Sequence, residues 1–463
     1  MKTFSVLTVG IGLLVASVSA VAESNPTTQL ELHVFDIPAP AVADRIQGLS
    51  TIWAEAKFSF AFFDQVPELD WDAAHHEYIT RVVEAETMYA YYRELQAFIA
   101  LLQDGHTGVA MPSSIRMDIV PLWFEVIDGR FIVHRAEIDL LERVPLGSEV
   151  VAVGGMDVRA YVEKEVIPDI AQSTVQAREK WASNALLSAS HGEPSDFTIL
   201  TPDGDRREIT SPAVYYYTDD TAYVPPMPSR ELAVEWLSDD IAKVTIPTFA
   251  DLSLPDQFDV LVPELETARA IIIDLSNNGG GHTSAATGVL RHFADRSLNG
   301  SKWTTREHRA SHRVWGYYGQ SDLSHYGQLD AWTEPENMPS VEVTSPGVLA
   351  GKPLAILTST LTASTAEDFL IYADPLEHVT RVGQPTFGST GQPWVFELPG
   401  GGRARICTKR DTWQDGTDFV GVGIEPHIPV ARTVEDIRDG SDPMLEAAVD
   451  HLNQQLADLS RSG

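Results

Sequence analysis

The stretch that decides the fold is residues 268–284, Ala-Arg-Ala-Ile-Ile-Ile-Asp-Leu-Ser-Asn-Asn-Gly-Gly-Gly-His-Thr-Ser. Its apolar run, with three isoleucines and Leu275, predicts a buried strand, and this strand ends in two asparagines and three glycines before a helical pattern begins. Glycine accepts positive φ and lets the backbone approach a ligand, so the N–H groups of this turn can point at a developing negative charge. A plain strand-to-helix connection explains the same residues, and both interpretations stay open at this point.

Outward from this stretch, strands alternate with helical patterns through the C-terminal half of the chain. We predict strands at 241–246, 270–275, 354–358 and 379–382. Such alternation is typical of an α/β domain that binds its ligands at the carboxyl ends of the strands. The segment 299–347 interrupts the alternation with many aromatic residues, which could line a groove, although packing in the interior is the default expectation.

The N-terminal half has other patterns. Apolar residues at helical spacing predict helices between residues 41 and 102, whereas residues 117–210 are β-rich, with a hairpin signal at Asp128-Gly129. We therefore predict an α/β multi-domain chain. Its parts are a signal peptide at 1–22, an N-terminal helical region at 23–112, a small β-rich module of the PDZ type at 113–228 and an α/β core at 229–463.

Composition limits the partners of the chain. Its 463 residues carry a net charge of -33, which argues against nucleic acid or an anionic membrane as a partner. Lys2, the apolar stretch 4–18 and Ala20-Val21-Ala22 form the layout of a cleavable secretory signal, so we expect an exported protein, periplasmic or extracellular, with no integral membrane segment after cleavage. The single cysteine excludes an intramolecular disulfide and a cysteine-based metal cluster.

A second junction of strand and helix lies at residues 353–370, Pro-Leu-Ala-Ile-Leu-Thr-Ser-Thr-Leu-Thr-Ala-Ser-Thr-Ala-Glu-Asp-Phe-Leu. Ser364 stands where the helix begins, and Ser364 with Glu367 matches the capping box, in which the two residues cap the helix end reciprocally. A serine at a helix N-terminus is also well placed as a nucleophile, because the positive end of the helix dipole favours its alkoxide-like state. The local sequence supports both roles.

Several motifs together resemble the tail-specific, or C-terminal processing, serine peptidases. They are residues 271–281, Thr362 to Glu367, residues 382–388, residues 104–107 and residues 421–430. The motifs occur in the order found in that family and cover most of the mature chain. The resemblance implies a crotonase-like α/β peptidase core, a protein or peptide substrate, and neither a cofactor nor a metal.

The resemblance also implies site residues. The nucleophile of the family matches Ser364, and its oxyanion donors match the backbone N–H groups of Gly279, Gly280 and Thr365. The better known branch uses a lysine as the base, but the matching position here is Ser389, which cannot take the proton. The tricorn-like branch takes its base from a histidine in the motif that matches residues 104–107.

That histidine is His106, whose imidazole has a suitable pKa to accept the serine proton near neutral pH. A third group should orient His106, as the acid of a catalytic triad does. In the tricorn-like branch this group is a glutamate, but the matching position here is Val420; Asp418 is the acid nearest to that position in sequence, with Glu425 and Asp415 behind it. His282 and Lys409 are rival bases, although a surface histidine at a helix start and a solvated lysine on a strand explain them more simply.

These observations predict an exported serine endopeptidase that works through an acyl-enzyme on Ser364. The alternative is a catalytically silent relative that binds a peptide or an apolar ligand in the same groove. An esterase on the same dyad is a third possibility, because acyl transfer does not by itself select amide over ester.

Overall fold

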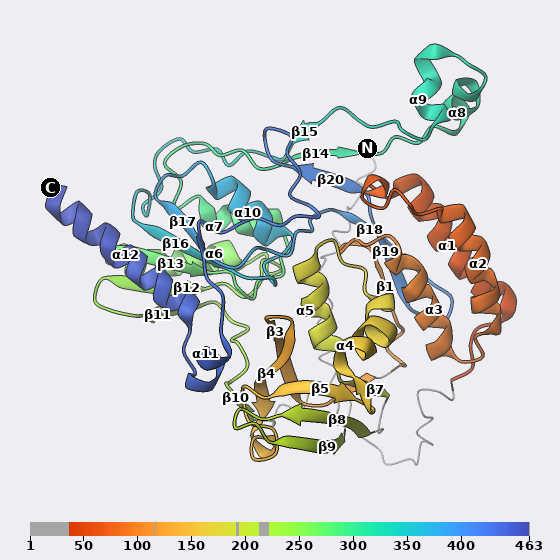
Figure 1. Cartoon of the computed structure of the whole chain (residues 1–463). Helices are drawn as coiled ribbons and strands as arrows, with labels where there is room; N and C mark the ends of the chain where they lie inside the picture. The colour runs from red at the N-terminus through yellow and green to blue at the C-terminus, as the bar shows by residue number, and fades with distance from the viewer. Residues whose placement is uncertain (1–36, 116, 191–193, 213–221, 463) are drawn as a thin grey trace, which may run out of the picture.

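The computed structural model describes residues 37–115, 117–190, 194–212 and 222–462 of the chain (Figure 1). The predicted signal peptide, 1–22, lies outside the described residues. Within the described ranges, no helix combines the length and apolar character needed to cross a membrane.

A six-stranded sheet forms the centre of the C-terminal half. In spatial order its strands are β11 (Ala233–Trp236), β12 (Ile241–Thr245), β13 (Ala270–Asp274), β16 (Leu354–Thr358), β17 (Val379–Gly383) and β21 (Ile428–Pro429). Neighbouring strands run parallel, except that β11 is antiparallel to β12. The predicted α/β alternation is therefore present, and the four strands predicted from the sequence lie side by side.

Helices cover both faces of this sheet, which explains the continuous apolar run of β13. Ile271 and Ile273 pack in the cluster that holds the helices of one face, whereas Ile272 packs against the helix of the other face. The first face carries α6 (Leu254–Leu265), α7 (Thr283–Leu290) and α10 (Thr365–Ala373), and the second carries α12 (Pro443–Ser462) (Figure 1).

The N-terminal helices join the same hydrophobic core. They are α1 (Val42–Ser59), the short η2 (Phe63–Gln65), α2 (Trp71–Glu84) and α3 (Met88–Ala100). Tyr92, Leu95 and Ile99 are buried on one face of α3 in the cluster that also contains Ile271. Asp70 caps α2 by accepting a hydrogen bond from the N–H of Ala73.

A seven-stranded antiparallel sheet with its own apolar cluster forms the middle of the chain. Its main path is β10 (Tyr223–Val224), β4 (Arg130–Glu137), β5 (Glu149–Val153), β8 (Pro194–Leu200) and β9 (Arg206–Pro212), and β3 (Leu122–Ile127) pairs with β4 and β6 (Met156–Asp157) with β5. Asp128 and Gly129, both at positive φ, form the predicted hairpin turn between β3 and β4. Its helical elements are η3 (Ile138–Leu140), α4 (Val158–Tyr161), η4 (Val162–Val166), η5 (Ile167–Asp169) and α5 (Val175–Ala185), and β2 (Met117–Ile119) pairs with β7 (Ser188–Ser190).

Two three-stranded sheets connect these parts. One is β1 (Gly108–Ala110), β19 (Arg403–Cys407) and β18 (Pro393–Glu397), and the other is β15 (Glu336–Asn337), β14 (Lys302–Thr305) and β20 (Lys409–Thr412). The antiparallel pairing of β1 with β19 ties the end of the N-terminal helical region to the C-terminal half. A short helix, α11 (Val434–Asp439), precedes α12.

The aromatic insertion, residues 299–347, differs from its default expectation of interior packing. It projects from the body of the molecule and carries α8 (Ala310–Tyr317), η6 (Ser321–Leu323) and α9 (Ser324–Gly327) at its tip (Figure 1). Trp315, Tyr317 and Tyr318 are 57%, 83% and 75% exposed, whereas Tyr326 is buried. The tip packs largely on itself, so part of its aromatic surface stays in contact with solvent.

Candidate active site

Ser364 stands at the junction of β16 and α10, where the backbone turns sharply. Its φ of 57° and ψ of -125° lie in a region that non-glycine residues rarely adopt. Such strain persists only where neighbouring contacts impose it, and it clusters at functional sites. Here the N–H of Ala363 donates to the carbonyl of Asn278, and the N–H of Ser364 donates to the carbonyl of Ser389.

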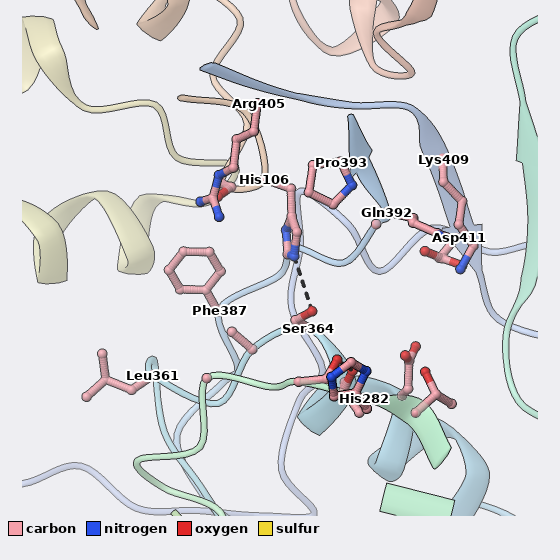
Figure 2. Close-up of a pocket in the computed structure, with 18 of the residues that line it drawn as sticks. His106, His282, Leu361, Ser364, Phe387, Gln392, Pro393, Arg405, Lys409 and Asp411 are labelled. Carbon is pink, nitrogen blue, oxygen red and sulfur yellow. Dashed lines mark hydrogen bonds and ion pairs between the residues drawn. The ribbon is translucent and has the colours of Figure 1, made fainter. Parts of the chain in front are cut away.

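The imidazole of His106, which lies between α3 and β1, faces this serine. Its Nε2 lies 3.2 Å from Oγ of Ser364 (Figure 2). The residues on either side of His106 are fixed: Arg405 donates a 2.8 Å hydrogen bond to the carbonyl of Gly105, and the hydroxyl of Thr107 accepts the N–H of Cys407. The structure thus brings together two residues that are 258 positions apart in the sequence.

The second ring nitrogen of His106 is also engaged. Its Nδ1 lies 2.7 Å from Oγ of Ser389, and the same Oγ lies 3.4 Å from Oδ1 of Asp104. The carboxylate of Asp104 is buried and also accepts hydrogen bonds from the hydroxyl of Ser173 and the N–H of His106, each at 3.2 Å. Burial raises the pKa of this carboxyl, while hydrogen bonds and the charge of Arg405 oppose the shift.

Proton donors and acceptors in this row have one consistent direction when Asp104 is ionised. Because a carboxylate only accepts, Ser389 donates to Asp104, and Nδ1–H of His106 donates to Ser389. Nε2 is then left with its lone pair toward the hydroxyl of Ser364. This tautomer is the one that a general base needs.

Burial keeps the ring of His106 neutral. It lowers the pKa of His106 to about 3, and the positive charges of Arg405 and Lys409 act in the same direction. The free site therefore holds an uncharged base at neutral pH.

Glu367 connects the nucleophile to the loop that carries Ser389. Its fully buried carboxyl accepts hydrogen bonds from the N–H groups of Ser364, Gly388 and Ser389 and from the hydroxyl of Thr386. The bond to Ser364 is one half of the predicted capping box. Burial raises the pKa of Glu367 to about 8, and the four hydrogen bonds oppose this shift.

The glycine turn after β13 packs directly against Ser364. A Cβ atom on Gly280, which has a φ of +100°, would lie 2.7 Å from Cβ of Ser364 and 2.9 Å from the nitrogen of Thr365. The N–H of Gly280 donates to Oδ1 of Asn278 at 2.8 Å, so it is already occupied. Gly279 and Thr365 line the cleft, and within the described residues their N–H groups make no hydrogen bond.

The acids predicted near residue 420 lie elsewhere. Asp418 forms an ion pair with Arg410 at 2.9 Å, and Asp415 accepts the N–H of Thr417 in its own turn. No hydrogen bond joins Asp418, Asp415 or Glu425 to the ring of His106 in the described part of the chain; Ser389 and Ser364 occupy its two nitrogens. The structure therefore does not bring Asp418 to the dyad.

The rival bases line the same cleft without contacting the nucleophile. His282 is the residue before α7, and Lys409 forms an ion pair with Asp411 at 2.8 Å (Figure 2). No hydrogen bond links either side chain to Ser364 within the described ranges.

The dyad opens into a cleft with a volume of about 330 Å³. Apolar side chains that include Phe387 and Leu361 line one end of it, and Lys409 and Asp411 line the other (Figure 2). Among the described residues, no group of three or more histidine, cysteine or acidic side chains is close enough to hold a metal ion. The arrangement of a strained serine, a neutral imidazole and nearby N–H groups suits acyl transfer.

Sequence reasoning did not anticipate the roles of Asp104, Ser173 and Ser389 around His106. Ser389 was identified only as the residue at the position where the better known branch of the resembling peptidases has a lysine. Asp104 belongs to the same motif as His106, and this proximity was the available signal. Ser173 precedes α5 of the middle module, and nothing in the local sequence marks it.

Comparison with known proteins adds a family and a fold. Residues 240–430 match the family model described as peptidase family S41, and this segment contains Gly279, Ser364 and Ser389. The chain is similar to the structure of mature CPAF complexed with lactacystin, with 17% sequence identity, a TM-score of 0.69 and coverage of 89% of this chain and 97% of that chain.

A putative peptidase from Parabacteroides merdae is also similar in structure. It has 17% identity, a TM-score of 0.50 and coverage of 89% of this chain and 97% of that chain. At such identities the structural likeness concerns the fold alone, and the similarity to the family rests on the sequence match of residues 240–430.

Proposed function

We propose that this chain is a serine-type peptidase of family S41, and that it is an endopeptidase that cleaves peptide bonds through an acyl-enzyme on Ser364, with His106 as general base. The observation that carries the proposal is the 3.2 Å distance between Nε2 of His106 and Oγ of Ser364. The distance between base and nucleophile is often longer in a free enzyme than in the complex with substrate. A distance of 3.2 Å in the free protein is therefore short enough to allow proton transfer once substrate is bound.

In the first step, Oγ of Ser364 attacks the scissile carbonyl carbon while its proton passes to Nε2 of His106. The carbon–nitrogen bond then breaks, and the same proton goes to the leaving amine. Water attacks the resulting ester, gives a proton to His106, and the free acid leaves as Ser364 recovers its hydrogen. One histidine thus serves as base and acid in turn.

Asp104 takes the orienting role through Ser389. When the ring of His106 becomes positively charged, its Nδ1–H donates to Ser389, whose own proton points to Asp104. A buried carboxylate two hydrogen bonds away stabilises the charged ring, because the local dielectric is low. The relay takes the place of the acid that the sequence suggested at Asp418.

The oxyanion donors in this proposal are the backbone N–H groups of Gly279 and Thr365. Both residues line the cleft and have unoccupied N–H groups in the described structure. The N–H of Gly280 bonds Asn278, and we assign Gly280 a steric role in holding the turn against Ser364. Donors fixed in advance act on charge that develops only in the transition state.

We further infer that the six-stranded sheet with its helices is a crotonase-like core and that the middle sheet is a PDZ-like module. The module reaches the site, since Ser173 bonds Asp104 and Thr174 donates to the carbonyl of Phe387. The pattern of residues 1–22 supports export to the periplasm or beyond the cell. Mass measurement of the protein recovered from cell fractions tests this: a chain beginning at Met1 and retained in the cytoplasm would contradict export.

The experiment that tests the function is labelling of the purified protein with a fluorophosphonate probe. We expect labelling of the wild type and its loss in Ser364→Ala and His106→Ala. The matched control is His282→Ala, which removes a second imidazole from the same cleft and should leave labelling unchanged. Wild-type protein that resists the probe and cleaves no peptide would favour the silent binding protein, and hydrolysis of esters alone would favour an esterase.

A further inference from the structure

The cleft has two ends of different chemistry on opposite sides of the dyad. Leu361 and Phe387 lie on one side of Ser364, while Lys409 and Asp411 lie on the other (Figure 2). We call the second side the charged end, and its lining side chains are Thr283, Asp368, Gln392, Lys409 and Asp411. A peptide that crosses Ser364 must place part of its chain along each end.

Two of the three charged groups at this end satisfy each other. Lys409 lies 2.8 Å from Oδ1 of Asp411, and the two side chains are 12% and 1% exposed. Asp411 also accepts hydrogen bonds from the hydroxyl of Thr390 at 3.0 Å and from that of Ser301 at 3.3 Å. This pair is therefore neutral as a unit and has its hydrogen-bonding capacity largely filled.

Asp368 is the group with capacity left over. It comes from α10, is 7% exposed and lines the cleft, and its Oδ1 has no hydrogen-bond partner within the described residues. A buried carboxylate oxygen without a partner is costly to the folded protein. Burial and the neighbouring charge of Asp411 raise the pKa of Asp368 to about 7, while Lys409 and a hydrogen bond with Thr283 oppose the shift. A cation placed beside Asp368 would favour its ionised form.

A second hollow continues from the charged end and shares Gln392, Pro393 and Lys409 with the cleft. Its walls include Trp303 and Trp394, the latter 54% exposed. Tryptophan faces attract ammonium and guanidinium groups and also pack against their apolar stems. Nζ of Lys409 already lies 5.8 Å from the centre of the Trp303 ring, so the extension offers apolar surface for the stem of a long side chain, and the cationic end would be held at Asp368.

We propose that the charged end is a subsite for a lysine or arginine side chain of the peptide substrate, and that Asp368 holds its cationic group. This inference rests on the proposed peptidase function, since it assigns a substrate class to the same cleft. Asp368 is accordingly a specificity-determining residue. An acidic side chain or a chain-terminal carboxylate fits less well, because it would approach Asp368 while Lys409 remains committed to Asp411.

Binding is measured in a Ser364→Ala background, so that turnover plays no part. The probes are fluorescein-labelled nonapeptides of alanine and glycine with lysine, arginine, norleucine or glutamate at the central position, followed by fluorescence anisotropy. We expect the lysine and arginine peptides to bind at least about tenfold more tightly than the norleucine peptide, as a hydrogen bond to a charged group allows. Adding Asp368→Asn should remove that preference and leave the norleucine affinity unchanged.

Asp415→Asn is the matched control, because Asp415 is an exposed carboxylate in a turn away from the cleft, and it should keep the preference. Asp368→Asn is nearly isosteric and relieves repulsion from Asp411, and fluorophosphonate labelling of the single variant with Ser364 intact verifies its fold. A wild-type-like preference in Asp368→Asn, no preference for basic peptides, or a preference for glutamate would each overturn the subsite. Failure of the wild type to react with the probe would instead overturn the peptidase proposal.

Discussion

The hydroxyl of Ser389 lies 2.7 Å from Nδ1 of His106, on the opposite edge of the imidazole ring from the nucleophile. This contact replaces a direct bond between the histidine and an acid, because the carboxylate of Asp104 stands one hydrogen bond further away. A serine in this position is uncharged, but its hydroxyl is polarised by the buried carboxylate and so lets that carboxylate stabilise the charged ring of His106. The relay makes predictions that differ from those for a directly bonded triad acid.

We expect Ser389→Ala to lower kcat by about tenfold to a hundredfold, less than the roughly 10⁴-fold loss known when the acid of a direct triad is neutralised. Asp104→Asn should lower kcat further, since it removes the negative charge and leaves one oxygen for the three donors of Ser173, Ser389 and His106. Peptide hydrolysis under steady-state conditions measures both effects.

Ser173→Ala is the control, because this hydroxyl bonds Asp104 and the N–H of Gly105, and no hydrogen bond joins it to the ring of His106 in the described structure. It should cost less activity than Ser389→Ala. Ser389→Ala with unchanged kcat and an unchanged pH profile would exclude the relay.

The pH dependence of kcat/KM should show an acid limb well below pH 6.5. Burial lowers the pKa of His106 from 6.5 to about 3, so the ring stays in its basic form in mildly acidic solution. The sign for stability follows from the same shift. The folded state binds fewer protons than the unfolded state at this ring, so its contribution is complete above pH 6.5 and is lost as the pH falls toward 3.

Arg405→Gln removes a positive charge that faces His106 and should move the acid limb upward in pH, although Lys409 still opposes protonation. Arg403→Gln is the control on the same strand, since Arg403 is exposed and pairs with Glu397. An acid limb at or above pH 6.5 in the wild type would contradict the neutral, buried base.

Gly280→Ala should abolish activity and destabilise the fold. The new Cβ would lie 2.7 Å from Cβ of Ser364 and 2.8 Å from the carbonyl oxygen of Ala363, at a φ of +100°. We expect a loss of about 2–4 kcal/mol in the free energy of unfolding, from strain and overpacking together. Chemical denaturation and fluorophosphonate labelling measure the two effects.

Gly416→Ala measures the cost of backbone strain alone, because Gly416 has a φ of +91° and its added Cβ would have no neighbouring atom within 4 Å in the described structure. It should cost about 1–2 kcal/mol and leave labelling intact. Equal labelling of the Gly280 and Gly416 variants would show that close packing of the glycine turn is not needed for the nucleophile.

The sequence predicts the strands and the main residues of the site better than the hydrogen bonds between them. The isoleucine run of 271–273 predicts a buried strand correctly, because helices cover both faces of that strand. Ser364 and His106 are identified because their motifs occur in the order found in the tail-specific peptidases. The direction in which a single backbone N–H points cannot be predicted from the sequence in the same way. The N–H of Gly280 donates to Asn278, two residues earlier, and nothing in a row of three glycines indicates which of their N–H groups remains free.

Long-range and local partners explain the other differences. Ser389 and Asp104 are 285 positions apart, and only the folding of the N-terminal helical region onto the C-terminal half brings them together. Asp418 was selected by its position in the sequence, but Arg410, eight positions earlier on β20, forms an ion pair with it, so here a local partner decides the outcome. Distance along the chain is a poor guide once β1 and β19 have joined the two halves.

Glu367 should prove essential for both stability and activity, because one buried carboxyl accepts four hydrogen bonds from the nucleophile and the loop of Ser389. Glu367→Ala leaves three donors without an acceptor, while the N–H of Ser364 keeps the carbonyl of Ser389, and we expect a loss of about 3 kcal/mol or more in the free energy of unfolding. Glu367→Gln keeps one oxygen but turns an N–H₂ group toward donors, so its loss should be intermediate. Activity should fall in both variants as Ser364 and Ser389 lose their common support.

Asp436→Asn supplies the comparison, since Asp436 completes a capping box with Thr433 on α11 and is partly exposed. That variant should lose about 1 kcal/mol, as expected for a weakened cap, and keep wild-type labelling. If Glu367→Gln behaved in the same way, Glu367 would be a helix cap only. A larger loss of labelling than of stability would show instead that the carboxyl positions the nucleophile against His106.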